Sequence, residues 1–249
     1  VIAVDTICPA RRDLAREASL RHAELLRETW ERHAAAAATP EGVGARRLRN
    51  VCLWILTRTG MSEDLARAFR QLESDTLDQT FGALRALVDL GGAPRDEALA
   101  RAAGRWSAVP QQFDHWFAVQ AQSTAEDAVD RIAALVAAPG FQAADAPRIK
   151  AVFDNLAVNV GAFHDRRGAG YAVLERALVA LDPVNPRLAA RFAKAFAAFE
   201  RVDPVRRQLV AEAVARLRDR PLSAELRGRL DPMATALAAA TLANQGAST

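Results

Sequence analysis

The chain has 249 residues and a mass of 26.9 kDa, and 51% of its residues are apolar, 25% charged and 6% aromatic. This composition is typical of a globular protein, excludes intrinsic disorder, and leaves no apolar run long enough for a transmembrane helix. The formal net charge is +3, and the basic residues alternate with acids instead of clustering, which argues against a nucleic-acid-binding protein.

Turn signals divide the chain into helices, beginning with a leading segment over residues 1–42. Pro9 opens an amphipathic run that we expect to continue to about Ala37, and the Thr39-Pro40-Glu41-Gly42 turn ends it. Shorter helical runs follow over residues 46–59, 62–72 and 75–90. Later helices are expected to start near Pro94, Pro110, Thr124, Asp145, Gly170, Asn185, Asp203 and Ser223.

Several of these starts carry capping residues. Asn185 and Asp203 each precede a proline, which suits the first position of a helix, and Thr124 with Asp127 resembles a capping box. No segment alternates apolar and polar residues as a half-buried strand does. The sequence therefore predicts an all-α protein.

Apolar residues inside these runs repeat at helical spacing. The clearest stripes are Ile149/Val152/Phe153/Leu156, Tyr171/Leu174/Leu178/Leu181 and Leu188/Phe192/Phe196/Phe199. Helix starts near 62, 94 and 124, and again near 170 and 203, recur about every 32 residues, and helix hairpins of that length bury their apolar faces by stacking. We therefore predict a superhelical solenoid of stacked antiparallel helix hairpins, armadillo- or HEAT-like, forming a single domain over residues 1–249.

Residues 158–170 break this period. We predict an irregular loop there, and irregular segments on a regular scaffold are where functional residues often lie.

The sequence lacks the usual catalytic and metal-binding motifs. It has no H-E-x-x-H pattern, phosphate loop, dinucleotide fingerprint or nucleophile elbow around its four histidines, which are His22, His33, His115 and His164. Cys8 and Cys52 are expected to be small buried residues. The densest aromatic cluster is expected to fill the core and consists of Trp106, Phe113, Trp116 and Phe117.

A stripe of cations is the most suggestive polar pattern. Arg187, Arg191 and Lys194 follow one another at i, i+4 and i+7, and Lys150 and Asp154 are similarly placed beside the apolar stripe of an earlier helix. This spacing fits a solvated helix face. It also fits a surface that attracts an anionic group such as a peptide carboxylate.

Several segments in order resemble a known family. They are LRNVCL at 48–53, DHWFAVQA at 114–121, PRI at 147–149, GAFH at 161–164, GAGY at 168–171 and NPR at 185–187 with Arg191. This succession, from about Arg46 to Leu237, resembles the C-terminal domain of bacterial aminopeptidase N, the zinc-dependent alanyl aminopeptidases of the gluzincin type.

The resemblance implies a domain that lacks the catalytic residues and the metal site of the enzyme. In this family an upstream catalytic domain holds the zinc, which polarises the water that attacks the first peptide bond of a peptide. The C-terminal domain is a helical superhelix that caps the active-site cavity. We therefore expect no cofactor in this chain and zinc in the parent enzyme. The expected partners are the upstream catalytic domain and the peptide substrate, with neither nucleic acid nor membrane.

The resemblance also suggests substrate-binding residues. Lys150 occupies a position that is often basic in relatives, and Arg191 falls on a family arginine that faces the cavity. Arg187 stands where close relatives carry an uncharged polar residue, and we include it as a third substrate contact. No catalytic or metal-binding residue is expected.

Two further expectations concern the parent protein and its location. Because the chain starts at Val1 and not at Met, we expect an excised C-terminal domain that is inactive in isolation, and because no signal peptide is seen, we expect a cytoplasmic location. The main alternative is a free-standing helical-repeat module that binds a partner peptide in its concave groove. A helical-repeat DNA-binding protein is a more distant alternative.

Overall fold

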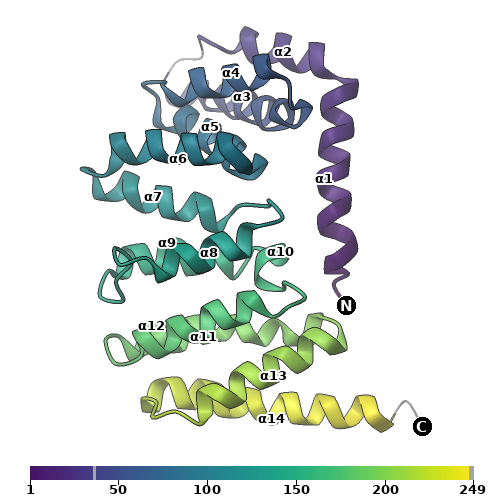
Figure 1. Ribbon diagram of the computed structural model, residues 1–249, viewed down its shortest axis with the longest axis vertical. Helices are drawn as coiled ribbons and strands as arrows, with labels where there is room; N and C mark the ends of the chain where they lie inside the picture. The colour runs from purple at the N-terminus through teal and green to yellow at the C-terminus, as the bar shows by residue number, and fades with distance from the viewer. Residues whose placement is uncertain (36–37, 247–249) are drawn as a thin grey trace. The chain divides into compact units, whose positions relative to one another are not determined.

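The computed structural model describes residues 1–35 and 38–246, and all regular structure in these ranges is helical (Figure 1). The chain divides into two compact units. The N-terminal unit comprises residues 8–127, and the C-terminal unit comprises the chain from Ala128 onward together with residues 1–7. The prediction of an all-α fold is confirmed for the described residues, whereas the single-domain boundary stays a prediction.

The helices of the N-terminal unit are α1 (Val4–Arg21), whose first residues belong to the other unit, α2 (Ala23–Arg32), α3 (Val43–Leu56), α4 (Ser62–Leu72), α5 (Leu77–Leu90), α6 (Gly92–Trp106) and α7 (Pro110–Ala121), with 3-10 turns η1 (Pro40–Gly42) and η2 (Thr57–Thr59). Those of the C-terminal unit are α8 (Ala128–Ala137), α9 (Ala146–Leu156), α10 (Val160–Phe163), α11 (Ala169–Leu181), α12 (Pro186–Ala193), η3 (Lys194–Arg201), α13 (Pro204–Arg218) and α14 (Ala224–Gly246).

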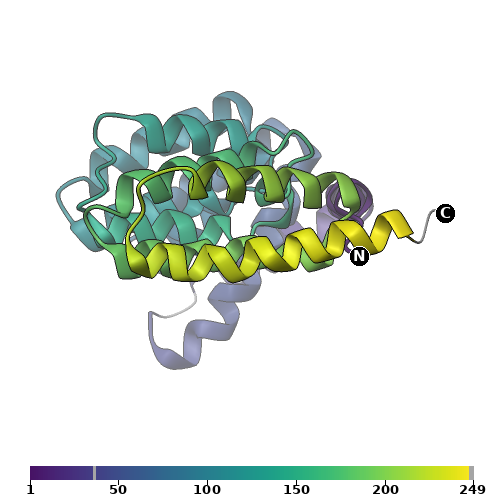
Figure 2. The ribbon, with the colours of Figure 1, turned by 90° about the horizontal axis from the view of Figure 1, so that it is seen from below.

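Within each unit, helices contact both the next helix and the next but one. In the N-terminal unit α5 packs on α4, α6, α3 and α7, and in the C-terminal unit α12 packs on α11 and α14. Helices α13 and α14 also contact each other (Figure 2). Contacts of both kinds arise when helix hairpins stack in two layers, which is the repeat architecture that the sequence predicts.

The predicted apolar stripes form the core of the C-terminal unit. All twelve residues of the three stripes are buried. Phe153 of α9 packs against Phe192 of α12 with ring centroids 5.7 Å apart, and Phe163, Tyr171 and Phe196 form a second aromatic group. In the N-terminal unit, Cys52 is buried as expected, whereas Cys8 is only partly buried.

The expected aromatic cluster lies in the N-terminal unit. Trp116 and Phe117 meet edge to face at 4.9 Å, and Phe113 contacts both of these rings. Trp106 is buried and meets Phe81 at 5.0 Å. The core role of Trp106 and Phe117 is confirmed, while Phe113 and Trp116 are only partly buried.

Local capping signals set several helix starts. The side chains of Asp145, Asn185 and Asp203 accept hydrogen bonds from the backbone three residues later, at 3.0–3.1 Å. These caps confirm the predicted starts of α9, α12 and α13, because each side chain satisfies a backbone N–H that has no partner inside the helix.

Two expected boundaries are wrong, and at the second of them tertiary contacts override the local sequence. The leading helix starts at Val4 instead of Pro9 and breaks at His22, and Ala37 lies outside the described residues. The predicted capping box does not form, since α8 begins at Ala128. The Thr124 N–H donates to Asp89 at 2.7 Å, and Asp127 accepts from Arg95 at 2.7 Å.

The segment 158–170 is partly helical. It contains the four-residue helix α10 and reaches the first residues of α11, with a turn between them. Gly168 has φ of +74°, and a Cβ on Gly170 would lie 2.4 Å from the carbonyl oxygens of Ala162 and Phe163. Glycine is therefore required at both positions, at the first for its backbone conformation and at the second for the close approach of α11 to α10.

We predict that Gly170→Ala destabilises the C-terminal unit by about 2 kcal/mol or more, because the methyl group meets backbone atoms that cannot rotate away. Urea unfolding followed by circular dichroism measures this loss. Gly228→Ala is the matched control, since no atom lies within 4 Å of its Cβ position in α14 and alanine favours helix by up to about 1 kcal/mol. Equal stability of the two variants would contradict the packing argument.

Candidate functional site

The predicted substrate-contact residues lie on α9, α12 and the start of η3 in the C-terminal unit. We define the basic face as Lys150, Arg187, Arg191 and Lys194, all of which are exposed. Arg191 Nη2 of α12 donates to Asp154 Oδ1 of α9 at 2.5 Å. This ion pair joins the two helices, and Lys150 and Arg187 each lie one turn before a partner of the pair.

The basic face rests on a buried aromatic support. Phe153 and Phe192 pack together beneath the ion pair, and the guanidinium carbon of Arg191 lies 5.2 Å from the centre of the Phe192 ring. Because both phenylalanines are buried in the core, the backbone that carries the cations is held in place.

Charge is concentrated on this face. Lys150, Arg187 and Lys194 form no ion pair or hydrogen bond with any residue that the structure describes. Four cations and one carboxylate, Asp154, give a local charge of 4 − 1 = +3, which equals the formal net charge of the whole chain, 33 − 30 = +3.

The Arg191–Asp154 pair is half-exposed, with 49% and 44% of the two side chains accessible. Ion pairs in such positions stabilise proteins by at most about 1 kcal/mol, because water screens both charges. An anion from solution can therefore approach Arg191 at little cost to the fold.

The segment 158–170 holds a buried polar cluster in the same unit. His164 and Tyr171 are almost fully buried, and His164 Nδ1 lies 2.7 Å from the Tyr171 hydroxyl. Arg206 Nε donates to the His164 carbonyl oxygen at 2.6 Å, and the two terminal nitrogens of Arg206 bond to Asp5 and Asp203. We call these five residues the Arg206 cluster.

Burial and charge shift the titration of this cluster. Burial, with the nearby Arg206, lowers the pKa of His164 from 6.5 to about 4, and burial raises the pKa of Tyr171. Burial opposes the charge on Arg206, but hydrogen bonds to Asp5 and Asp203 still raise its pKa. The same bonds lower the pKa of both carboxyl groups. The residues of the Arg206 cluster satisfy one another's hydrogen-bonding groups in the interior. The GAFH and GAGY motifs, which supply His164 and Tyr171, therefore have a structural explanation.

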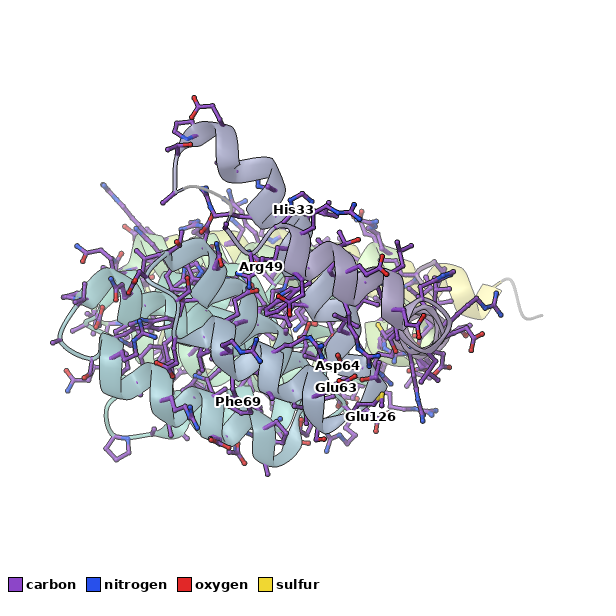
Figure 3. All side chains as sticks on the ribbon, turned by 90° about the horizontal axis from the view of Figure 1, so that it is seen from above. His33, Arg49, Glu63, Asp64, Phe69 and Glu126 are labelled. Carbon is purple, nitrogen blue, oxygen red and sulfur yellow. The ribbon has the colours of Figure 1, made fainter. Side chains whose placement is uncertain are left out.

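A second motif of the resemblance forms a buried network in the N-terminal unit. Arg49 donates to the Trp30 carbonyl at 3.2 Å and to Gln79, and its guanidinium lies 4.2 Å from the Trp30 ring centre. Asn50 donates to the Asp78 carbonyl at 2.8 Å and accepts from Gln71 at 2.7 Å. Arg49 lies among the helices of this unit in Figure 3. The LRNVCL segment thus holds α2, α3 and α5 together.

The start of α4 carries an acidic pair, Glu63 and Asp64 (Figure 3). The Asp64 side chain is completely buried, and it accepts hydrogen bonds from Arg27, Thr59 and Arg67 at 2.7–3.1 Å. Hydrogen bonds from Arg27 and Thr59 outweigh burial and lower the pKa of Asp64. Its oxygens are occupied by neighbouring side chains, which leaves them no room to bind a ligand.

The described residues offer no metal site, since no three His, Cys, Asp or Glu side chains among them come together as ligands could. His164 is buried against Tyr171, and His115 stacks on Phe81 with ring centroids 3.8 Å apart. The residues present therefore do not fit a bound zinc ion. No described helix has the length and apolar composition to cross a membrane.

A family model described as "Domain of unknown function (DUF3458_C) ARM repeats" matches residues 1–234. Aminopeptidase N of Caulobacter vibrioides is 34% identical over 163 residues, which cover 65% of this chain and 19% of that protein. Aminopeptidase N of Haemophilus influenzae is 29% identical over 180 residues, 72% of this chain and 21% of that protein. Aminopeptidase N of Escherichia coli is 28% identical over 182 residues, with the same two coverages.

Among solved structures, Legionella pneumophila aminopeptidase A in complex with aspartic acid matches with a TM-score of 0.79 and 21% identity, over 88% of this chain and 27% of that chain. This likeness shows a shared fold. The chain spans about a fifth of the length of the curated relatives it matches. Together these matches confirm the resemblance to the C-terminal domain of aminopeptidase N that the motifs predict.

We predict that the C-terminal unit loses stability as the pH falls from 6.5 to 4. The unfolded chain binds a proton at His164 below pH 6.5, whereas the folded chain does so only near pH 4, so protonation favours unfolding in this window. A shift of this size corresponds to about 3 kcal/mol at most. Urea unfolding at several pH values measures the slope.

The variant His164→Gln should reduce this slope. A smaller slope should remain in that variant, because burial also lowers the pKa of His115 in the N-terminal unit. Asp5 and Asp203, whose pKa values are lowered, add to the slope only at the lower end of this window, because the stability they contribute is lost progressively below about pH 5. An unchanged slope in His164→Gln would contradict the prediction.

Proposed function

Because the chain belongs to the family described as "Domain of unknown function (DUF3458_C) ARM repeats", we propose that it is the non-catalytic C-terminal domain of a zinc aminopeptidase and contacts the peptide substrate. In this proposal the basic face lies toward the active-site cavity that the domain caps. Lys150, Arg187 and Arg191 attract the C-terminal part of the peptide, while the zinc and the bond-breaking groups belong to a catalytic domain outside this chain.

The observation that carries the proposal is the charge of the basic face. A peptide with a free C-terminus presents a carboxylate, and arginine and lysine are the side chains that bind carboxylates most strongly. Lys150 and Arg187, which have no ion-pair partner among the described residues, break no contact within the protein when they pair with such a ligand. The names of the relatives support the class of substrate, since the proteins that match over about a fifth of their length are aminopeptidases.

In the same proposal, hydrolysis of the peptide bond takes place in a domain outside this chain. A zinc-bound water needs ligands of the His or carboxylate type around an open metal, and neither the sequence motifs nor the described side chains supply such a group. The proposed role of this chain is therefore to shape the cavity and to select substrates.

We predict that the isolated chain, supplied with zinc, does not hydrolyse alanyl anilides. An absorbance assay of the released aniline measures this, with an intact aminopeptidase as the positive control. Turnover that survives repeated purification and disappears on chelation would overturn the non-catalytic assignment.

We predict that the double variant Lys150→Ala/Arg191→Ala, made in the enzyme that contains this chain, weakens the use of peptides more than that of amino-acid anilides. Loss of a charge-assisted contact to a carboxylate corresponds to about 1–3 kcal/mol, or roughly a 5- to 100-fold fall in kcat/KM. An anilide has no C-terminal carboxylate and should be affected little.

Arg166→Ala is the matched control for this pair, because Arg166 is an exposed cation of the same unit that lies outside the basic face. An equal effect on peptides and anilides would contradict the substrate contact. It would leave the alternative, a module that binds a partner peptide away from any active site, as the better explanation.

A further inference from the structure

Asp154 is the acidic residue whose carboxylate pairs with the basic face. The geometry of its contact with Arg191 resembles that of the half-exposed Arg218–Asp231 pair and differs from those of two buried arginine pairs of the unit. Arg191 is bound through a single hydrogen bond from Nη2, and both side chains are about half-exposed. Arg216 binds Glu175 through both Nε and Nη2, and Glu175 is largely buried. Arg206 likewise uses two nitrogens on Asp5 and is itself buried.

The single bond leaves much of the Arg191 guanidinium available. An arginine side chain has five N–H donors arranged in a planar fork, and a carboxylate uses two of them when it binds with both oxygens. Asp154 takes one, so the contact neither buries the cation nor saturates it. An incoming carboxylate can share or replace this contact, whereas it cannot reach Arg206.

The position of Asp154 is fixed by its helix. Phe153, the preceding residue, is buried against Phe192, and Phe192 directly follows Arg191 in α12. Asp154 and Arg191 are thus each next in sequence to a core phenylalanine, and these two phenylalanines pack against each other. The backbone at Asp154 is therefore held beside that of Arg191, one helical turn from Lys150, so the carboxylate is always within reach of Arg191.

We propose that Asp154 is a specificity-determining residue that competes with the carboxylate of the substrate for Arg191 and so limits the affinity of the basic face for anionic peptides. The inference rests on the proposed function of this face. Asp154 carries the same chemical group as a peptide C-terminus, and its negative charge lowers the local charge from +4 to +3. Removing that charge while keeping an oxygen that can accept from Arg191 should strengthen the attraction for an anion.

The substitution that separates charge from geometry is Asp154→Asn, because asparagine retains a side-chain oxygen at the same distance from the backbone. Asp154→Glu is the matched control, since it keeps the charge. The probes are two fluorescently labelled decapeptides that have acetylated N-termini and no charged side chains. One has a free C-terminal carboxylate, and the other has a C-terminal amide. Fluorescence anisotropy with the full 249-residue chain gives the dissociation constants.

We expect Asp154→Asn to bind the carboxylate peptide about three- to fivefold more tightly than the unmodified chain at low ionic strength, with the amide peptide unaffected. The gain should shrink in about 0.5 M salt, where the screening length is only a few ångströms. Asp154→Glu should bind both peptides as the unmodified chain does. The unfolding temperature of each variant shows that the fold is retained, because the pair is half-exposed.

The outcomes distinguish the two proposals. If the unmodified chain prefers the carboxylate peptide but Asp154→Asn binds it equally or less tightly, Asp154 does not compete for Arg191 and the inference is wrong. If neither the unmodified chain nor Asp154→Asn distinguishes the carboxylate from the amide, the proposed carboxylate contact is wrong, and the inference falls with it.

Discussion

The C-terminal unit depends on one buried cation, Arg206. A guanidinium removed from water destabilises a fold by several kcal/mol unless its donors find acceptors. Arg206 finds them at the start of α1, at the end of α10 and at the N-cap of α13. Three elements must therefore be in place together before the charge is satisfied, and the close approach of Gly170 to α10 belongs to the same arrangement.

Arginine serves two opposite purposes in this molecule. Buried arginines such as Arg49 and Arg206 act as multivalent hydrogen-bond donors that connect helices, and their positive charge is screened from ligands by the protein itself. Exposed cations of the basic face contribute little to stability and remain accessible. The net charge is only +3 because 30 acidic residues offset the 33 basic ones, yet the exposed cations of the basic face still make one surface locally positive.

Sequence reasoning succeeded where structure is decided locally. The caps at Asn185 and Asp203 and the buried stripes around Phe153 and Phe192 follow from residues within a few positions of one another. It missed the boundary near Thr124, because the partner of that residue, Asp89, is 35 positions away. The same limit applies to the candidate site, where the contact between Asp154 and Arg191 depends on how α9 packs on its neighbours. The buried role of Arg206 was not visible either, since nothing local separates it from the solvent-exposed arginines around it, and only the tertiary fold shows what it contacts.

The two compact units differ in how early the ribosome has synthesised all of their residues. The N-terminal unit is continuous from Cys8 to Asp127, whereas the other unit needs both residues 1–7 and the chain beyond Ala128. Asp5 and Arg206 are separated by 201 positions, which a ribosome covers in about 10–40 s. During that interval residues 1–7 lack the partners that the C-terminal unit supplies, whereas all residues of the N-terminal unit have been synthesised before the interval ends.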